Sequence, residues 1–241
     1  MNNDKNSAAS CSTGVPPVRA NDAPDELPDI IKRKGARLPH WTREGGAYAI
    51  VFRLADSLPQ SILKSIIEER KEIPALAEQM KREMTPWEKQ RLQELHSERV
   101  EKFLQAGYGN CWLKRDDIAC MVQDALLHSR GIQYDLLCWC IMPNHVHVVL
   151  RPHKNFPLEK ILFSWKSYSA KKANKILGRT GVFWSTEYYD HLIRNEAEMV
   201  HALRYAWLNP EKAGFKKWKW RGILEEADGT AGSTVEKGNG L

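Results

Sequence analysis

The sequence predicts an α+β protein in which helices pack on the faces of an antiparallel sheet. Short apolar runs rich in β-branched and aromatic residues are typical of strands. They alternate along the chain with longer segments in which apolar residues recur at helical spacing. No apolar run reaches the roughly 20 residues that a membrane-spanning helix needs. Elements in this order bury one core between a sheet and its helices.

The first expected strand covers residues 47–54 (AYAIVFRL), which are apolar, aromatic and β-branched. A helix should follow, because Asp56-Ser57 offers side-chain oxygens suited to capping a helix. Residues 64–106 are dense in Glu, Lys, Arg and Gln, and Thr85-Pro86 within them is typical of a new helix start. We therefore expect a charged helical insertion over 64–106.

The second half of the chain continues with alternating helices and strands. The turn at Pro143-Asn144 separates two strands that are expected to be neighbours. The expected elements are a helix over 116–130, strands over 134–142 and 145–150, a helix over 157–177, a strand over 188–194 and a helix over 196–208. Asn209-Pro210 should end the last helix, because proline disfavours helical conformation in the residue before it.

Both ends of the chain differ in composition from this core. Residues 1–38 and 225–241 are polar and lack apolar periodicity, so we expect disorder there and a single domain over 39–224. The N-terminus has no hydrophobic segment of the kind found in secretory signals. The five cysteines are odd in number and include no CxxC pair, which favours reduced thiols. A cytoplasmic protein is expected.

Positive charge gathers in the second half of the chain. Residues 151–221 hold 15 Lys and Arg against 6 Asp and Glu, a net of +9, whereas the whole chain carries +6. This asymmetry indicates a polyanionic partner, with nucleic acid first. A solvated lysine-rich surface is the alternative interpretation.

His145 and His147 form the sharpest local motif. Alternate residues of a strand point to the same face, so both imidazoles project together, roughly 6 to 7 Å apart along the strand. Two imidazoles so placed can bind one divalent ion. The same pair could also lie on the solvated face of a strand.

Cys138 and Cys140 share a face of the preceding strand, just across the turn from the histidines. A Cys2His2 zinc site is therefore conceivable, although the CxCx4HxH spacing lacks the usual zinc-knuckle pattern. We favour the alternative that both cysteines are buried strand residues, because cysteine behaves as a small hydrophobe.

Tyr205 stands apart on the last predicted helix. With 100° per residue, the apolar stripe of this helix is expected about 120° to 220° away from Tyr205. That stripe consists of Met199, Val200, Leu203 and Trp207. Tyr205 should therefore point away from the core, with His201, Asn209 and Glu198 beside it. A surface tyrosine packed on a loop is the alternative.

The motifs together resemble the REP-associated tyrosine transposases, which are relatives of the small single-tyrosine insertion-sequence transposases. The resemblance covers roughly residues 45–222. It rests on AYAIVFRLADSLP (47–59), MPNHVHVVL (142–150), ILFSWKSYSAKKANKILGRTGVFW (161–184), EYYDHLIRN (187–195) and LRYAWLNPEKAGF (203–215). It implies an antiparallel sheet with flanking helices, similar to the ferredoxin or RNA-recognition fold.

The resemblance also implies site residues. His145 and His147 correspond to the metal-binding histidine–hydrophobic–histidine pair, and Tyr205, four residues before Asn-Pro, to the nucleophile. Asn209 falls on the third metal ligand. Imidazole and amide-oxygen ligands suit Mg²⁺ or Mn²⁺. Tyr168, on the lysine-rich helix, is the best rival to Tyr205, but its i+4 residue is Lys172, which is no metal ligand.

The implied activity is cleavage and rejoining of single-stranded DNA beside hairpin-forming repeats, through a 5′-phosphotyrosine link and without ATP. The alternative is a domesticated protein that binds hairpin DNA without cutting it. Basic residues expected to hold DNA phosphates are Lys160, Lys166, Lys171, Lys175, Arg179, Arg194, Lys216 and Lys217. We expect a monomer or homodimer that associates with the nucleoid and with no membrane.

Overall fold

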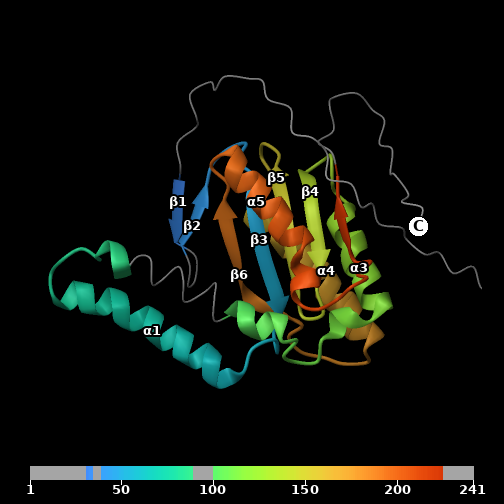
Figure 1. Ribbon diagram of the computed structural model, residues 1–241, viewed down its shortest axis with the longest axis horizontal. Coiled ribbons are helices and arrows are strands. Elements are labelled where there is room, and N and C mark those ends of the chain that lie inside the picture. Colours follow the sequence, from blue (N-terminus) through green and yellow to red (C-terminus); the bar gives the residue numbers. More distant parts are fainter. Residues whose placement is uncertain (1–30, 35–38, 89–99, 225–241) are drawn as a thin grey trace, which may run out of the picture.

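Five strands form one antiparallel sheet at the centre of the protein (Figure 1). The computed structural model describes residues 31–34, 39–88 and 100–224. Across the sheet the strands follow the order β6-β3-β5-β4-β7, so the histidine strand β5 is the central one. Their bounds are β3 (Tyr48–Leu54), β4 (Tyr134–Ile141), β5 (His145–Pro152), β6 (Trp184–Leu192) and β7 (Arg221–Ile223).

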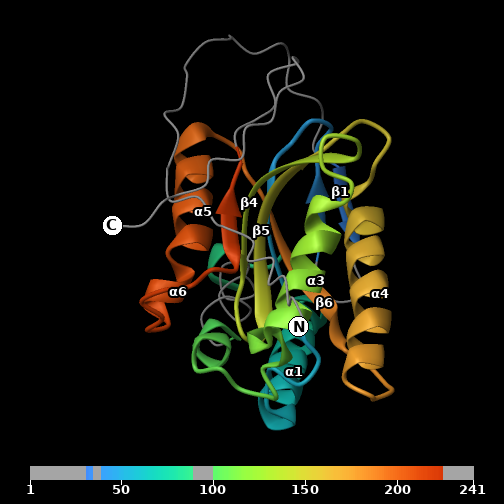
Figure 2. The same ribbon diagram turned by 90° about the vertical axis from the view of Figure 1, so that its right-hand side faces the viewer.

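Helices cover both faces of this sheet, which confirms the α+β class. Helices α3 and α4 lie against one face and α5 against the other (Figure 2). The helical elements are α1 (Gln60–Gln79), the 3-10 turn η1 (Trp112–Lys114), α3 (Asp116–Leu127), α4 (Leu158–Ile176), α5 (Glu196–Trp207) and α6 (Asn209–Lys212). The order β6-β3-β5-β4, with α3 before β4 and α4 after β5, is the ferredoxin-like arrangement.

Large aromatic side chains fill the layer between the sheet and helices α3 and α4. The Phe52 and Trp184 rings meet edge to face with centroids 4.9 Å apart, and those of Tyr134 and Trp165 do so at 5.1 Å. Trp165 Nε1 donates a hydrogen bond to the Tyr134 hydroxyl, which donates in turn to the Leu126 carbonyl. The polar atoms of these rings are thus satisfied inside an apolar layer.

Smaller side chains line the opposite layer, under α5. Ala202 and Ala206 are the buried residues of α5, and they pack against Val149 and Cys138 of the sheet. A register shift between Leu136 and Cys138 in β4 inserts an extra residue there. Because these residues are small, the backbone of α5 approaches the sheet closely. The side chains along the edge of α5 therefore lie over β5.

The ends of the predicted elements differ from the observed ones by a few residues. Strand β6 begins at Trp184, four residues before the predicted start, and α6 and β7 have no counterpart in the prediction. Residues 31–34, assigned from the sequence to a disordered arm, form strand β1 (Ile31–Lys34), paired with β2 (Pro39–Thr42). The remainder of that arm, 1–30 and 35–38, and the tail 225–241 lie outside the described residues.

The described part of the charged insertion is helical over 64–79, 86–88 and 100–105, and α1 projects away from the sheet (Figure 1). Ser57 does not cap α1 as expected. Its hydroxyl donates to the Leu54 carbonyl, and Pro59 occupies the cap position. The predicted helix start at Thr85 is confirmed, because the Thr85 hydroxyl accepts from Glu88 N–H while the Glu88 carboxylate accepts from Thr85 N–H. No helix among the described residues could cross a membrane.

Candidate active site

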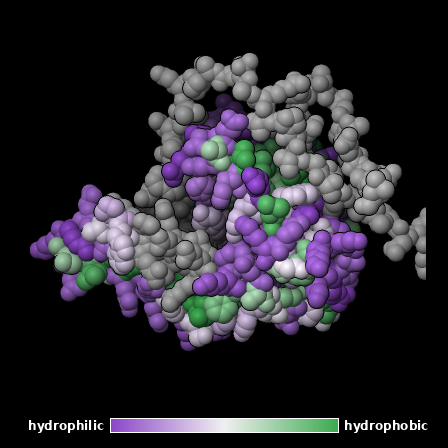
Figure 3. All heavy atoms as spheres, in the orientation of Figure 1, coloured by the Kyte–Doolittle hydropathy of each residue, from purple (hydrophilic) through white to green (hydrophobic). Residues whose placement is uncertain are grey.

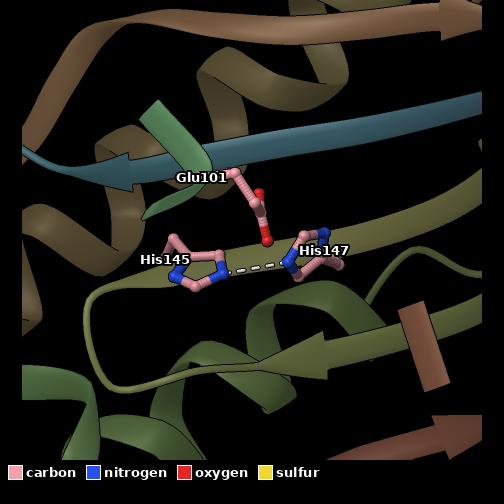
Figure 4. Close-up of side chains that lie close together, drawn as sticks. All are labelled: Glu101, His145 and His147. Atoms are coloured by element: carbon pink, nitrogen blue, oxygen red, sulfur yellow. Dashed lines mark hydrogen bonds between the residues drawn. The ribbon is translucent and has the colours of Figure 1, made fainter. Parts of the chain in front are cut away.

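The two histidines lie side by side on the face of β5 that α5 covers. Their Nε2 atoms are 2.9 Å apart, and the ring centroids 4.7 Å (Figure 4). Both side chains are buried, because α5 and the charged insertion cover this face of β5. The predicted shared orientation is therefore what the structure has, but the alternative of a solvated strand face is wrong.

Asn144, the turn residue before the pair, sets the orientation of His145. The Asn144 amide is fully buried, and its Oδ1 accepts a hydrogen bond from His145 Nδ1 at 2.7 Å. On the other side, Asn144 Nδ2 donates to the Tyr108 carbonyl at 2.9 Å. With its proton on Nδ1, the His145 ring presents the Nε2 lone pair to the site, as a metal ligand must. Sequence reasoning did not single out Asn144, although its position next to the motif was a signal.

Both imidazoles are held in the neutral form. Burial lowers the pKa of His145 well below its usual value, and the neighbouring His147 adds to this effect. Burial likewise lowers the pKa of His147 to about 4, although the Glu101 carboxylate opposes the fall. Neutral imidazole is the form that binds a cation, so at neutral pH neither ring carries the extra proton that would repel one.

Asn209, at the start of α6, brings a buried amide to the same place. Its side chain is close enough to three neighbours for a weak polar interaction, which raises the pKa of His145 and His147 and lowers that of Tyr205. Neither its Oδ1 nor its Nδ2 forms a hydrogen bond of good geometry with a described residue. An unpartnered buried amide is costly to keep, so this one indicates a ligand that binds there.

Tyr205 lies over the histidine pair from α5. Its ring centroid is 5.5 Å from that of His147, and the His201 ring stacks on it at 6.2 Å. The predicted direction was partly wrong. The buried stripe of α5 is centred on Ala202 and Ala206, whereas Val200 is exposed, so Tyr205 lies at the edge of the core and half-buried. The wheel misplaced the stripe because small alanines contribute little to an apolar pattern.

A cation faces the tyrosine as well. Lys212 Nζ lies 4.3 Å from the centroid of the Tyr205 ring. Burial raises the pKa of the Tyr205 hydroxyl, and the Glu101 carboxylate raises it further. The phenol is therefore fully protonated at neutral pH and is a weak nucleophile without help. Sequence reasoning did not identify Lys212, which follows Tyr205 by seven residues and faces its ring.

Glu101 is the second residue that sequence reasoning missed. One of its carboxylate oxygens lies within 4.8 Å of a ring nitrogen of each histidine, and the side chain points between the two rings (Figure 4). The residue comes from the charged insertion, 44 positions before His145. No local pattern distinguishes it from the many other glutamates of that segment.

The cysteines do not join this group. Cys140 pairs with His147 across the strands, but neither cysteine belongs to the cluster of ligand atoms around the histidines. Both are fully buried, and burial raises the pKa of the Cys138 thiol to about 12. The interpretation as buried strand residues is confirmed, and a Cys2His2 zinc site is not formed.

A cavity of about 680 Å³ opens beside His147 and Tyr205, between α5 and strands β3 and β6. This volume falls in the range of small-molecule sites. Its walls are largely apolar, with Val51, Tyr189 and Ala202 among them, and Arg53 and Glu187 add charge. The outer surface on the α5 side of the molecule is mostly hydrophilic (Figure 3).

The predicted phosphate-binding residues fall into two groups. Lys160, Lys171 and Lys175 are exposed on α4, on the face of the sheet opposite the histidines. Lys166, also on α4, is half-buried and donates to the Thr186 carbonyl, and burial lowers its pKa to about 8. Arg179 follows α4 and donates to the Val182 carbonyl.

The second group lies after β6. Arg194 is exposed just before α5, and Lys216 and Lys217 are exposed after α6. Tyr168, the rival nucleophile, belongs with the α4 group. The residue is 44% exposed, and Lys172 Nζ lies 4.9 Å from the centroid of its ring. Only Tyr205 of these two tyrosines therefore meets the histidines.

The donor set fits a divalent cation. Two neutral imidazoles, an unpartnered amide and a carboxylate converge from β5, α6 and the insertion, and these are the mixed N and O ligands that such ions accept. His145, His147 and Asn209 are the residues that would hold the ion, with Glu101 beside them.

Comparison with known proteins shows a similarity to transposases. Residues 126–205 match the family described as "Transposase IS200 like", and this segment contains both histidines and ends at the tyrosine. A curated protein of Haemophilus influenzae described as a REP-associated tyrosine transposase is 23% identical, over 36% of this chain and 57% of its own length. The chain thus spans a little over half of that relative. The resemblance indicated by the motifs is confirmed.

Two solved structures are also similar. One is a REP-associated tyrosine transposase bound to a REP hairpin, with 14% identity, 71% of this chain and 70% of the other covered, and a TM-score of 0.37. The second is a Deinococcus radiodurans protein described as a transposase, with 11% identity, coverage of 68% of this chain and 89% of the other, and a TM-score of 0.28.

Proposed function

Because residues 126–205 relate this chain to the IS200-like transposases, we propose that it is a metal-dependent single-strand DNA endonuclease and transposase. Tyr205 is the nucleophile, and the DNA is cut beside a hairpin-forming repeat. The observation that carries the proposal is the contact of Tyr205, from α5, with His147 of the histidine pair on β5, at 5.5 Å between ring centroids.

The residues of the site have different roles in the proposed reaction. His145, His147 and Asn209 would hold Mg²⁺ or Mn²⁺, which supplies charge stabilisation at the oxygens of the scissile phosphate when bound. Lys212, next to the Tyr205 ring, is placed to attract that phosphate to the nucleophile. The fixed Asn144–His145 hydrogen bond keeps the lone pair of His145 directed into the site.

The proposed cleavage step consumes no cofactor. The Tyr205 hydroxyl oxygen forms a bond to phosphorus, and the bond between phosphorus and the 3′-oxygen breaks. The tyrosine proton passes to the leaving 3′-oxygen, which gives a free 3′-hydroxyl and a 5′-phosphotyrosine. Attack by a 3′-hydroxyl on this link reverses the step, so strands are rejoined without ATP.

The DNA would approach from two sides. Unpaired bases next to the cut would enter the cavity beside Tyr205, where the ring of Tyr189 offers a stacking surface. The hairpin stem would lie on the exposed basic residues, of which Arg194, Lys216 and Lys217 are on the side of α5 and α6. A protein that cleaves chromosomal repeats would be located in the cytoplasm, at the nucleoid.

The test is formation of a covalent adduct. Wild-type protein is incubated with labelled single-stranded hairpin DNA and Mn²⁺, and the products are separated on a denaturing gel. We expect an adduct whose nucleotide maps to the peptide containing Tyr205. Tyr205→Phe should abolish it while hairpin binding survives, and Tyr168→Phe is the matched control that should leave it unchanged.

Two outcomes would contradict the assignment. An adduct that persists in Tyr205→Phe or disappears in Tyr168→Phe would transfer the role to another tyrosine. Hairpin binding without any adduct in the wild type would instead support a catalytically silent DNA-binding protein.

A further inference from the structure

The charged insertion returns to the core at the active site. Residues 100–105 are helical, and Val100 and Leu104 pack with Leu58 and Ile66 in a small apolar cluster of their own. The insertion thus leaves the sheet along α1 and comes back against the beginning of that helix. This packing sets the position of the helical segment 100–105, and with it the position of Glu101.

The chain after Glu101 is anchored to the core by polar contacts. Asn110 donates to Asp56 Oδ2 from its backbone N–H at 2.9 Å and from its side chain at 2.6 Å. Gly109 has φ +93°, and a Cβ there would lie 2.6 Å from the Asp56 carbonyl oxygen, so only glycine permits this approach. The Tyr108 carbonyl accepts from Asn144, the residue that orients His145. The placement of Glu101 is therefore tied to the histidines themselves.

The carboxylate is held in a defined orientation. Gln105, one helical turn further, donates to Glu101 Oε1 at 2.9 Å. Within the described part of the chain, Glu101 has no ion pair with a lysine or arginine. A half-buried carboxylate held by a neutral amide and pointing between two imidazoles has the geometry of a ligand (Figure 4).

We propose that Glu101 is an additional ligand of the divalent cation, so that the insertion supplies the anionic part of the metal site. This inference rests on the metal dependence of the proposed function. His145, His147 and Asn209 are all neutral, and a divalent charge buried among neutral groups is costly unless an opposite charge is near. A carboxylate oxygen offsets that charge and favours hard cations such as Mn²⁺ and Mg²⁺.

A consequence is that metal binding joins the insertion to the sheet. Glu101 and the histidines belong to segments that are distant in sequence, and one ion would bridge them. A ligand that binds only the folded arrangement stabilises it. We therefore expect Mn²⁺ to raise the melting temperature of the protein, and Glu101 to account for part of that rise.

The experiment measures Mn²⁺ binding without DNA, so it does not depend on catalysis. Full-length protein is titrated with Mn²⁺, and free Mn²⁺ is followed by its electron paramagnetic resonance signal. Glu101→Gln keeps the shape of the side chain and removes the charge, and we expect its dissociation constant to rise at least tenfold. Glu187→Gln removes a carboxylate from the wall of the same cavity, outside the ligand cluster, and should change the constant less than threefold.

Thermal unfolding accompanies the titration. Metal-free Glu101→Gln should melt close to the wild type, and Mn²⁺ should raise its melting temperature less than it raises those of the wild type and Glu187→Gln. Should Glu101→Gln fail to fold, Glu101→Asp decides, because it keeps the charge but shortens the reach and should bind Mn²⁺ with intermediate affinity.

The outcomes separate this inference from the proposed function. Equal Mn²⁺ affinity in Glu101→Gln and wild type would overturn the role of Glu101 and leave the nuclease intact. Normal Mn²⁺ binding that depends on Glu101, together with no adduct at Tyr205, would support the ligand and contradict the nuclease. A wild type that binds no Mn²⁺ would overturn the ligand assignment.

Discussion

The two faces of the central sheet are built from different residues and serve different ends. The face under α3 and α4 is filled with large rings, among them Phe52, Trp165 and Trp184. The face under α5 is packed with small residues such as Ala202 and Ala206, and it leaves a buried polar group, His147, beside a cavity. The comparison indicates that stability is concentrated on the first face, which allows the second to hold groups that are unfavourable to bury.

The largest effect on stability is expected on the aromatic face. Trp165→Ala removes a ring that is only 5% exposed and that packs on Tyr134 and Phe52. Loss of this packing should lower the free energy of unfolding by about 3–5 kcal/mol. Urea denaturation with and without Mn²⁺ measures it, and the loss should be the same in both. A change below about 1 kcal/mol would contradict the division of the faces.

The next effect concerns which face carries the hairpin stem. Lys171 and Lys175 are exposed on α4, away from the histidines. If both contact phosphates, replacing both by alanine should reduce the slope of log K against log salt by about 2. Binding should then weaken by on the order of tenfold to a hundredfold at 0.1 M salt, and less at higher salt.

Filter binding over a range of salt concentrations measures this slope. Lys216→Ala with Lys217→Ala is the matched double variant on the side of α6. A slope that changes only in the second double variant would show that the stem lies on the active-site face, and the α4 lysines would then be a solvated surface.

Two buried asparagines sharpen the comparison within the active-site face. Asn209 has no hydrogen-bond partner among the described residues, whereas both polar atoms of the Asn144 side chain are bonded. Without metal, Asn209→Leu should raise the free energy of unfolding by about 1–2 kcal/mol, and Asn144→Leu should lower it by a similar amount. Both should impair adduct formation.

Denaturant titration in EDTA compares the two variants directly. A loss of stability in Asn209→Leu as large as that in Asn144→Leu would mean that the Asn209 amide contributes to the fold and is not held for a ligand.

The smallest effect is expected in the insertion, away from both faces. The Arg82 guanidinium and the Thr85 N–H hold the pKa of Glu88 down at about 2. A carboxyl with a lowered folded-state pKa stabilises the fold above its unfolded pKa, near 4.5, and this contribution is lost as the pH falls toward 2. Solvent reaches Arg82, so the effect should be small.

Comparison of the wild type with Glu88→Gln isolates this contribution. The difference in their free energies of unfolding should be constant from pH 7 to about 5 and shrink below that. A difference that grows on acidification would contradict the assignment of the low pKa to Glu88.

Local patterns were enough to predict several features. The alternation of side chains along β5 placed His145 and His147 on one face, and the helix of Tyr205 ends at Trp207, close to its predicted end, although Asn209 then begins the short helix α6. These predictions held because strand and helix geometry depend on neighbouring residues. The same reasoning identified the central strands, whose β-branched and aromatic residues are buried on both faces.

Other features depended on contacts between distant segments. Glu101 reaches the histidines because Val100 and Leu104 pack on Leu58 and Ile66, and no periodicity records a contact across that distance. The direction of Tyr205 was decided by the two small alanines of α5, which let the helix settle with its edge over β5. The sequence thus determined which residues are available to the site. The packing of α5 and of the insertion decided which of them come into contact, because burial is a property of the assembled layers.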